Sequence, residues 1–218
     1  MTDPQPLPDT LPLFPLPGVL LLPHGCLPLH VFEPRYRSLI RDAMETDKLI
    51  GMVQTVDAHD DLVPDDARLY EVGCSARITE FNETDDGRFL ITICGVSRFH
   101  IQTDEPTEAG YRRARVTYAG FERDSVTPTP AETEAERQSL MHAIDEFFEV
   151  ADDGADWAAI AEANTVDLLT SLAMISPLEA RDKQALLECP TTAERQKLLV
   201  ALMDMAANGD NSPTTQTQ

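Results

Sequence analysis

The residues best suited to chemistry in this 218-residue chain are histidines and cysteines of its first half. His24, Cys26 and His30 share parity, so one continuous strand would place them on one face, where they could bind a metal ion. Pro28 interrupts that strand pattern, and Gly25 favours a turn. No C-x-x-C or H-E-x-x-H spacing accompanies them. We therefore expect a buried cysteine between two turn or surface histidines, and no metal site.

A second possible site pairs a cysteine nucleophile, Cys74 or Cys94, with His100. Neither cysteine has a helix N-terminus or a cationic neighbour to lower the pKa of its thiol. We expect all four cysteines, Cys26 and Cys189 included, to be small buried apolar residues of a cytoplasmic protein. A Cys74–Cys94 disulfide is the alternative, if the strands that carry these residues are neighbours.

Motifs of the common enzyme classes are absent from the sequence. It contains no glycine-rich loop ending in Gly-Lys-Ser/Thr for phosphate binding and no G-x-S-x-G nucleophile turn. Its three lysines, Lys48, Lys183 and Lys197, stand in helical or helix-end contexts that disfavour a lysine base. We expect no catalytic residues and no cofactor.

The sequence Phe32-Glu33-Pro34-Arg35-Tyr36 is a better candidate for binding. A charged pair at the start of a helix, flanked by two aromatic residues, could face a groove and bind a peptide. We name Phe32 and Arg35 as candidate peptide-binding residues. In the alternative, Glu33 caps the helix, Arg35 pairs with a carboxylate, and both aromatic rings pack in the core.

The elements around these residues follow from the proline and apolar patterns. The apolar run 11–31 is cut by Pro12, Pro15, Pro17, Pro23 and Pro28, so it must form short extended pieces with turns at residues 17–18 and 23–25. Apolar residues then recur at helical spacing and predict a helix over 34–46. Pro34 fits the first turn of that helix.

Strand patterns dominate the chain as far as residue 121. We expect strands over 49–53, 70–81, 89–93, 96–102 and 111–118, with a hairpin turn at 84–87 and a polar loop over 57–66. Gly73 suggests a bulge or a close approach, and Gly95 a break between two strands. Many short strands with one helix suggest a small barrel or sandwich.

After residue 121 the pattern becomes helical. We expect a loose N-terminus over 1–10, a β-rich subdomain over 11–121, a linker over 122–131, a helical bundle over 132–206 and a disordered tail over 207–218. Helix starts are indicated at Thr129–Glu132, Ser176–Glu179 and Thr191–Glu194, a buried helix at 166–175, and an apolar stripe at Leu140, Ile144, Phe147 and Phe148. The fold class is α+β.

The chain is strongly acidic, with 38 Asp and Glu against 17 Lys and Arg and a formal net charge of −21. Such a surface disfavours nucleic acid and anionic membranes, although Arg112, Arg113 and Arg115 form one basic spot. It is typical of solubility or adaptation to salt. No cation precedes Arg35 and the apolar run is too short to span a bilayer, so we expect a cytoplasmic protein without a membrane anchor.

Four motifs, taken together and in order, resemble the N-terminal substrate-binding domain of the ATP-dependent Lon protease family. They are residues 14–18 (FPLPG), 32–36 (FEPRY), 70–74 (YEVGC) and 95–99 (GVSRF), and the resemblance covers residues 9–205. It implies a PUA-like β-pseudobarrel with one helix, followed by a C-terminal α-helical bundle. In Lon proteases this domain is thought to capture unfolded or tagged substrates and to help hexamer assembly.

The Lon ATPase and the serine–lysine proteolytic pair lie in domains that these 218 residues do not contain, so the chain looks like a free-standing bacterial member of the family. The resemblance therefore implies a non-enzymatic module that binds unfolded or extended polypeptides, as an adaptor in protein quality control, with a Lon-type protease as a candidate partner. The alternatives are an RNA-binding PUA-like protein and a small-ligand or enzyme site in the pseudobarrel mouth. The residues predict no oligomeric state.

Overall fold

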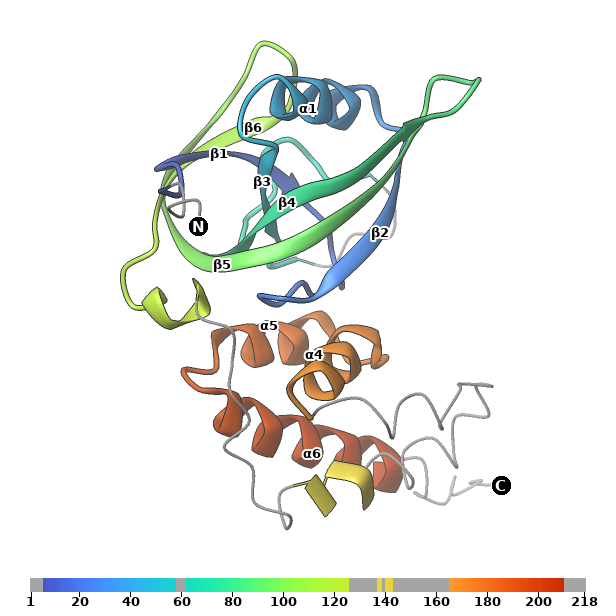
Figure 1. The fold of residues 1–218 in the computed structure, drawn as a ribbon, viewed down its shortest axis with the longest axis vertical. Helices are drawn as coiled ribbons and strands as arrows, with labels where there is room; N and C mark the ends of the chain where they lie inside the picture. The colour runs from blue at the N-terminus through green and yellow to red at the C-terminus, as the bar shows by residue number, and fades with distance from the viewer. Residues whose placement is uncertain (1–5, 58–61, 126–136, 139, 143–164, 210–218) are drawn as a thin grey trace, which may run out of the picture.

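The N-terminal half of the chain forms a small β-barrel, and the C-terminal helices pack beneath it (Figure 1). A computed structural model describes residues 6–57, 62–125, 137–138, 140–142 and 165–209. The strands are β1 (Thr10–Pro15), β2 (Cys26–Val31), β3 (Leu49–Val53), β4 (Val72–Glu83), β5 (Phe89–Pro106) and β6 (Arg112–Thr117). The expected α+β class, with a β-barrel followed by helices, is confirmed.

The barrel is closed by β5, the longest strand. The sheet order is β2-β5-β4-β3-β1-β6, and β5 pairs with β6 as well, so five strands form a ring. The first part of β5, Phe89–Cys94, pairs with β2, whereas its last part, His100–Pro106, pairs with β6. Strand β2 therefore lies outside the ring as an edge strand, a position that tolerates Pro28.

The expected strand break at Gly95 is wrong, because β5 runs through this residue from Phe89 to Pro106. Gly95 instead marks a shift of register against β4, between Ser75 and Ala76. A Cβ atom on Gly95 would lie 2.2 Å from the carbonyl oxygen of Leu22, so this position requires glycine. The sequence pattern thus indicated an unusual backbone position at Gly95, but it predicted a strand break where the structure has a register shift.

Helix α1 (Pro34–Met44) packs on the barrel, as predicted, and buries Tyr36, Leu39, Ile40 and Ala43. It ends two residues before the expected boundary, because Glu45 is its C-cap residue. Both expected turns before it are present and contain a residue with positive φ, Gly18 at 68° and His24 at 67°.

The described helices of the C-terminal part are α4 (Thr165–Ile175), α5 (Ala180–Glu188) and α6 (Thr192–Gly209), together with helical residues around Leu140. The expected buried helix over 166–175 is confirmed as α4. The start signal at Thr191 is confirmed too: its hydroxyl accepts a hydrogen bond from the Glu194 amide (3.2 Å) and donates one to the Glu194 carboxylate (2.9 Å). None of the described helices is both long and apolar enough to cross a membrane.

The expected helix start at Ser176 is wrong, because the N-cap residue of α5 is Glu179. Ser176 is buried and ends α4 instead: its amide and its hydroxyl both donate to the Leu172 carbonyl, at 2.9 and 2.6 Å. A serine before proline thus completes one helix here rather than beginning the next.

Several expected boundaries fall near or outside the described residues. The first part of the expected linker, Glu122–Ser125, is a short 3₁₀ helix, η1, and α6 runs to Gly209, into the segment expected as a tail. Leu140 is fully buried. The start signal at 129–132 and the remaining apolar positions, Ile144, Phe147 and Phe148, lie outside the described residues.

The core has two parts. A smaller cluster of apolar side chains, Leu11, Leu13, Leu49, Val53, Phe99, Ala114 and Val116, fills the barrel. A Cβ atom on Gly73 would lie 2.5 Å from the Phe99 ring, which confirms the expected close approach at Gly73. A larger cluster extends from α1 through β2, β4 and β5 to α4, α5 and α6, and thereby joins barrel and helices.

Candidate functional site

The residues between β2 and α1 lie beside a cavity of about 400 Å³. It is lined by Phe14, Pro15, Leu16, Pro17, His30, Val31, Phe32, Glu33, Tyr36, Leu62 and Val63. These residues come from the end of β1, the junction of β2 with α1, and the loop before β4; we call this cavity the β1–α1 groove. A predominantly apolar cavity of this size with few polar groups is typical of ligand sites.

Phe32 and Leu62 are the exposed apolar side chains of the β1–α1 groove. Phe32 is 56% exposed and Leu62 is 64% exposed, although large apolar side chains are usually buried. The alternative in which both aromatic residues of the Phe32–Tyr36 sequence pack in the core is thus right for Tyr36 and wrong for Phe32. The structure places Phe32 where a ligand can contact it, and its binding role stays a prediction.

Arg35 does not line the groove, but its side chain binds residues that form or adjoin the groove wall. Its Nε and Nη2 donate to Glu33 Oε2 at 3.0 and 2.9 Å, its Nη1 donates to Asp65 Oδ1 at 2.6 Å, and Nη2 also donates to the Val63 carbonyl at 2.7 Å. These contacts connect the start of α1 to the loop that carries Leu62. Arg35 pairs with carboxylates, as the alternative expected, and its role in binding stays a prediction.

Glu33 occupies the N-cap position of α1, but the expected cap contact is wrong. Its side chain makes no hydrogen bond to the helix and binds Arg35 instead. Both Arg35 contacts use Oε2, and among the described residues Oε1 receives no hydrogen bond. The Glu33 side chain is 19% exposed.

Stacked aromatic rings form the floor of the β1–α1 groove. The centroids of Phe14 and Tyr36 lie 4.5 Å apart, and the Arg35 guanidinium lies 4.7 Å from the centroid of the Tyr36 ring. Burial raises the pKa of the Tyr36 hydroxyl to about 12, so the ring stays neutral at physiological pH. The floor is thus aromatic and uncharged.

A second, shallower groove of about 490 Å³ lies on the other side of His30. We call it the β2–β5 groove; Pro28, Leu29, His30, Glu80, Phe81, Asn82, Leu90, Ile91 and Thr92 line it. Phe81 and Leu90 are 39% and 46% exposed. Because His30 lines both grooves, the two form adjoining apolar surfaces along β2.

The sequence 95–99 (GVSRF), one of the family motifs, has a structural role. Arg98 is buried, and its side chain donates to both carboxylate oxygens of Asp124, from Nε at 2.8 Å and from Nη2 at 2.7 Å. Its Nη1 donates to the carbonyls of Leu187 and Cys189, at 3.0 and 2.6 Å, at the end of α5. Arg98 therefore connects the barrel to the helices, and no substrate can reach it.

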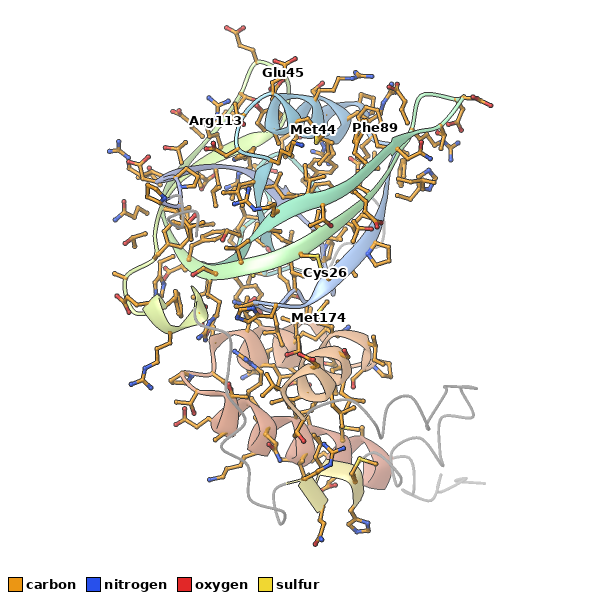
Figure 2. All side chains as sticks on the ribbon, viewed as in Figure 1. Cys26, Met44, Glu45, Phe89, Arg113 and Met174 are labelled. Carbon is orange, nitrogen blue, oxygen red and sulfur yellow. A yellow bond between two sulfur atoms is a disulfide. The ribbon has the colours of Figure 1, made fainter. Side chains whose placement is uncertain are left out.

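The cysteines form a different disulfide from the alternative considered. Cys26 of β2 is bonded to Cys94 of β5, whereas Cys74 and Cys189 are free and buried. The expectation of buried, unpaired cysteines is confirmed for Cys74 and Cys189 but wrong for Cys94 and for Cys26, which is exposed, and the Cys74–Cys94 pairing is wrong too. Cys26 and Cys94 are opposite each other in the β2–β5 register, which the sequence could not show because it does not reveal that β2 pairs with β5. Gly25, the residue before Cys26, lies against Met174 of α4, where barrel and helices meet; Figure 2 labels Cys26 and Met174 in this region.

No Cys–His catalytic pair forms among the described residues. Burial, and secondarily the charge of Asp124, raise the pKa of the Cys74 thiol to about 12. Cys94 is in the disulfide, and His100 stacks on Phe121 at 4.8 Å between ring centroids. Likewise, the described residues contain no group of three or more His, Cys, Asp or Glu able to hold a metal ion.

The three arginines of the expected basic spot on β6 do not form one exposed group. Arg112 pairs with Asp104 and donates to the Ala67 carbonyl, while Arg113 and Arg115 are exposed. Arg113 donates to the Tyr111 hydroxyl at 3.2 Å. The spot thus offers few cations for a phosphate backbone.

Leu62 and Val63, which line the groove, and Asp65, which binds Arg35, were not predicted as parts of the site. They belong to the segment 57–66, which was expected to be a polar surface loop. The short apolar sequence Leu62-Val63-Pro64 within that acidic loop was the available signal.

Comparison with known proteins agrees with this architecture. The family model of the ATP-dependent protease La (LON) substrate-binding domain matches residues 10–205. Lon protease 2 of Myxococcus xanthus is 28% identical over 205 residues, and Lon protease of Xanthomonas oryzae pv. oryzae is 30% identical over 210 residues. These alignments cover 91% and 94% of this chain but 24% of each relative, so the chain spans about a quarter of their length.

Two solved structures share the fold. A Lon N-terminal domain protein from Xanthomonas campestris has a TM-score of 0.59 at 26% identity, covering 88% of this chain and 97% of that one. The N-terminal domain of Mycobacterium avium complex Lon protease has a TM-score of 0.58 at 17% identity, with 89% and 98% covered. The sequence match and the barrel-and-helix architecture agree: this chain belongs to the Lon substrate-binding domain family.

Proposed function

We propose that this chain binds extended polypeptide segments and that their apolar side chains enter the β1–α1 groove. One observation carries the proposal: Phe32 and Leu62, both more than half exposed, line the same apolar groove. Burying such a side chain is worth about 1.5–3 kcal/mol. A bound apolar segment would cover these side chains in the way that a folded core does.

The shape of the site favours an extended chain as the ligand. Within the described residues, β2 pairs only with β5, so the other edge of β2 offers backbone groups to an added strand. Pro28 removes one donor from that edge, while the carbonyl groups of β2 remain. A segment along β2 would pass both grooves, since His30 lines each of them.

The family supports the same function. Its model describes a substrate-binding domain of an ATP-dependent protease, and the matched relatives are Lon proteases. We infer that this chain acts as a non-enzymatic substrate-binding module, and that it presents unfolded or exposed-hydrophobic proteins to a Lon-type protease.

Fluorescence anisotropy tests the proposal with a labelled 15-residue peptide of alternating Leu, Phe and Gln. Phe32→Ser combined with Leu62→Ser is expected to weaken binding about tenfold, the loss typical of central interface residues. Met205→Ser is the matched control, because Met205 is 71% exposed on α6, away from the groove. Equal affinity of the groove variant and the control would contradict the proposal.

A further inference from the structure

We propose that the β1–α1 groove selects polypeptide segments in which a lysine or arginine stands next to the apolar anchor residue. The inference rests on the proposed function, because it assigns a substrate class to the same groove. The proposed preference for basic segments arises from the charged groups at the groove rather than from its apolar walls.

The carboxylates at the groove outnumber its cations. Glu33 lines the groove, and Asp65 is joined to it through Arg35, so that two carboxylates share one guanidinium. Two negative charges and one positive charge leave an excess of one negative charge. Buried Val31 lines the groove as a low-dielectric wall and strengthens the field of this charge.

The arginine of this cluster has one of its five N–H donors, on Nη1, left for an acidic ligand. Arg35 makes four hydrogen bonds, to Glu33, Asp65 and the Val63 carbonyl, and its side chain is only 16% exposed. By contrast, Glu33 Oε1 and Asp65 Oδ2 receive no hydrogen bond from the described residues. The Asp65 side chain is 84% exposed. An incoming ammonium or guanidinium group therefore finds acceptors, whereas an incoming carboxylate meets like charge.

Exposed Phe32 adds a further contact for a cation. Its ring is 56% exposed and lies edge-on to His30, with 6.1 Å between the centroids. A cation over an aromatic face gains about 0.5–1 kcal/mol at an exposed site. Net charge favours the same ligands: a chain of −21 attracts basic segments from a distance and repels acidic ones.

The test uses three labelled peptides of equal length, each with a central Phe-Leu anchor flanked on both sides by Lys, by Gln or by Glu. At low ionic strength we expect the Lys peptide to bind about threefold more tightly than the Gln peptide and about tenfold more tightly than the Glu peptide. In 0.5 M salt the preference should fall below about twofold, because salt screens exposed charges.

Variants separate the groove from the overall charge. Asp65→Asn changes a mostly exposed side chain and should lose about half of the Lys-over-Glu preference; adding Glu33→Gln should leave only the small part that the net charge contributes. Glu45→Gln, at the opposite end of α1, changes the net charge equally and should keep the preference (Figure 2).

The outcomes distinguish this inference from the function on which it rests. If the Gln peptide binds and the three peptides have equal affinity, the charge selection is overturned while polypeptide binding stands. If Asp65→Asn and Glu45→Gln reduce the preference equally, its source is the overall charge and the inference is also overturned. If none of the peptides binds, the proposed function fails, and the selection fails with it.

Discussion

Arg98 and Arg35 have similar partners in two very different regions. Each binds carboxylate and backbone carbonyl groups: Arg98 binds Asp124 and the end of α5, and Arg35 binds Glu33, Asp65 and Val63. At the barrel–helix contact, the Arg98 and Asp124 side chains are 5% and 8% exposed, whereas Asp65 at the groove is 84% exposed. The buried pair fixes the architecture, and the exposed one positions the wall of a surface that a ligand can reach.

The difference between these regions shows how a family motif should be interpreted. GVSRF contains Arg98, whose side chain makes four hydrogen bonds, as that of Arg35 does, but is only 5% exposed and so is closed to a ligand. FEPRY lies beside a cavity and leaves one aromatic ring exposed. Both motifs identify the family, but only the second belongs to a candidate site.

The largest expected effect on stability comes from removing the buried Arg98–Asp124 ion pair. Arg98→Met leaves the Asp124 carboxylate buried without its partner, so the free energy of unfolding should fall by about 3–5 kcal/mol. Urea titration followed by circular dichroism measures the change. Arg88→Met is the matched control; its pair with Asp86 is about half exposed and should contribute at most about 1 kcal/mol. Similar losses for both variants would contradict the distinction by burial.

Alkaline pH tests the same buried region through the Cys74 thiol. Its pKa is raised from 9.0 to about 12, so the folded state keeps a proton that the unfolded state releases. The stabilisation that the protonated thiol gives the folded state is fully present below pH 9. It is lost as the pH rises from 9 to 12, which lowers the free energy of unfolding by about 4 kcal/mol at most. Cys74→Ala should therefore reduce the alkaline loss of unfolding free energy.

Cys189→Ala controls for that experiment, since Cys189 is less deeply buried and its thiol pKa is raised to a smaller degree. An alkaline loss that is the same in wild type and in Cys74→Ala would show that the thiol is not enclosed at the barrel–helix contact.

The disulfide links the two regions, because β2 carries both Cys26 and the groove residue His30. It joins residues 68 positions apart, so removing it with Cys26→Ala and Cys94→Ala should lower the free energy of unfolding by about 2–4 kcal/mol. A reducing agent should cause the same loss in the wild type and none in the double variant. Wild-type stability that does not respond to the reducing agent would contradict the link.

A smaller change in stability, with a larger change in binding, is expected at Arg35. Arg35→Met removes the contacts that hold Val63 and Asp65 and should cost about 1–2 kcal/mol of unfolding free energy. Peptide affinity should also fall, since the groove wall is released. Arg41→Met, on the same helix in a half-exposed pair with Glu83, should leave affinity unchanged. Unchanged affinity of Arg35→Met would confine Arg35 to a stabilising role.

The sequence predicted the elements well where local patterns decide them. The helical spacing after Pro34, the strand over 49–53 and the capping residues at Thr191 and Glu194 are local signals, and each has its expected structure. The pairing partners of β2, β5 and β6 depend on residues far apart in the chain, so neither the Cys26–Cys94 disulfide nor the continuous β5 could be foreseen.

The candidate site could be predicted only in part, for the same reason. Phe32 and Arg35 were identifiable from their place before a helix, but the opposite wall comes from a loop about 30 residues away. Exposure of Phe32 rather than of Tyr36 follows from the position of Phe14, whose ring stacks on Tyr36. Such contacts between distant segments decide which of two neighbouring aromatic residues enters the core.

Photo-cross-linking tests most directly the claim that polypeptides bind at the exposed groove and not at the barrel–helix contact. A peptide that carries benzoylphenylalanine at its apolar anchor is bound, irradiated, and located on the protein by mass spectrometry. We predict cross-links to residues 14–17, 30–33, 36 and 62–63, which form the β1–α1 groove. Cross-links concentrated on α4, α5 and α6, with none at the groove, would contradict the account.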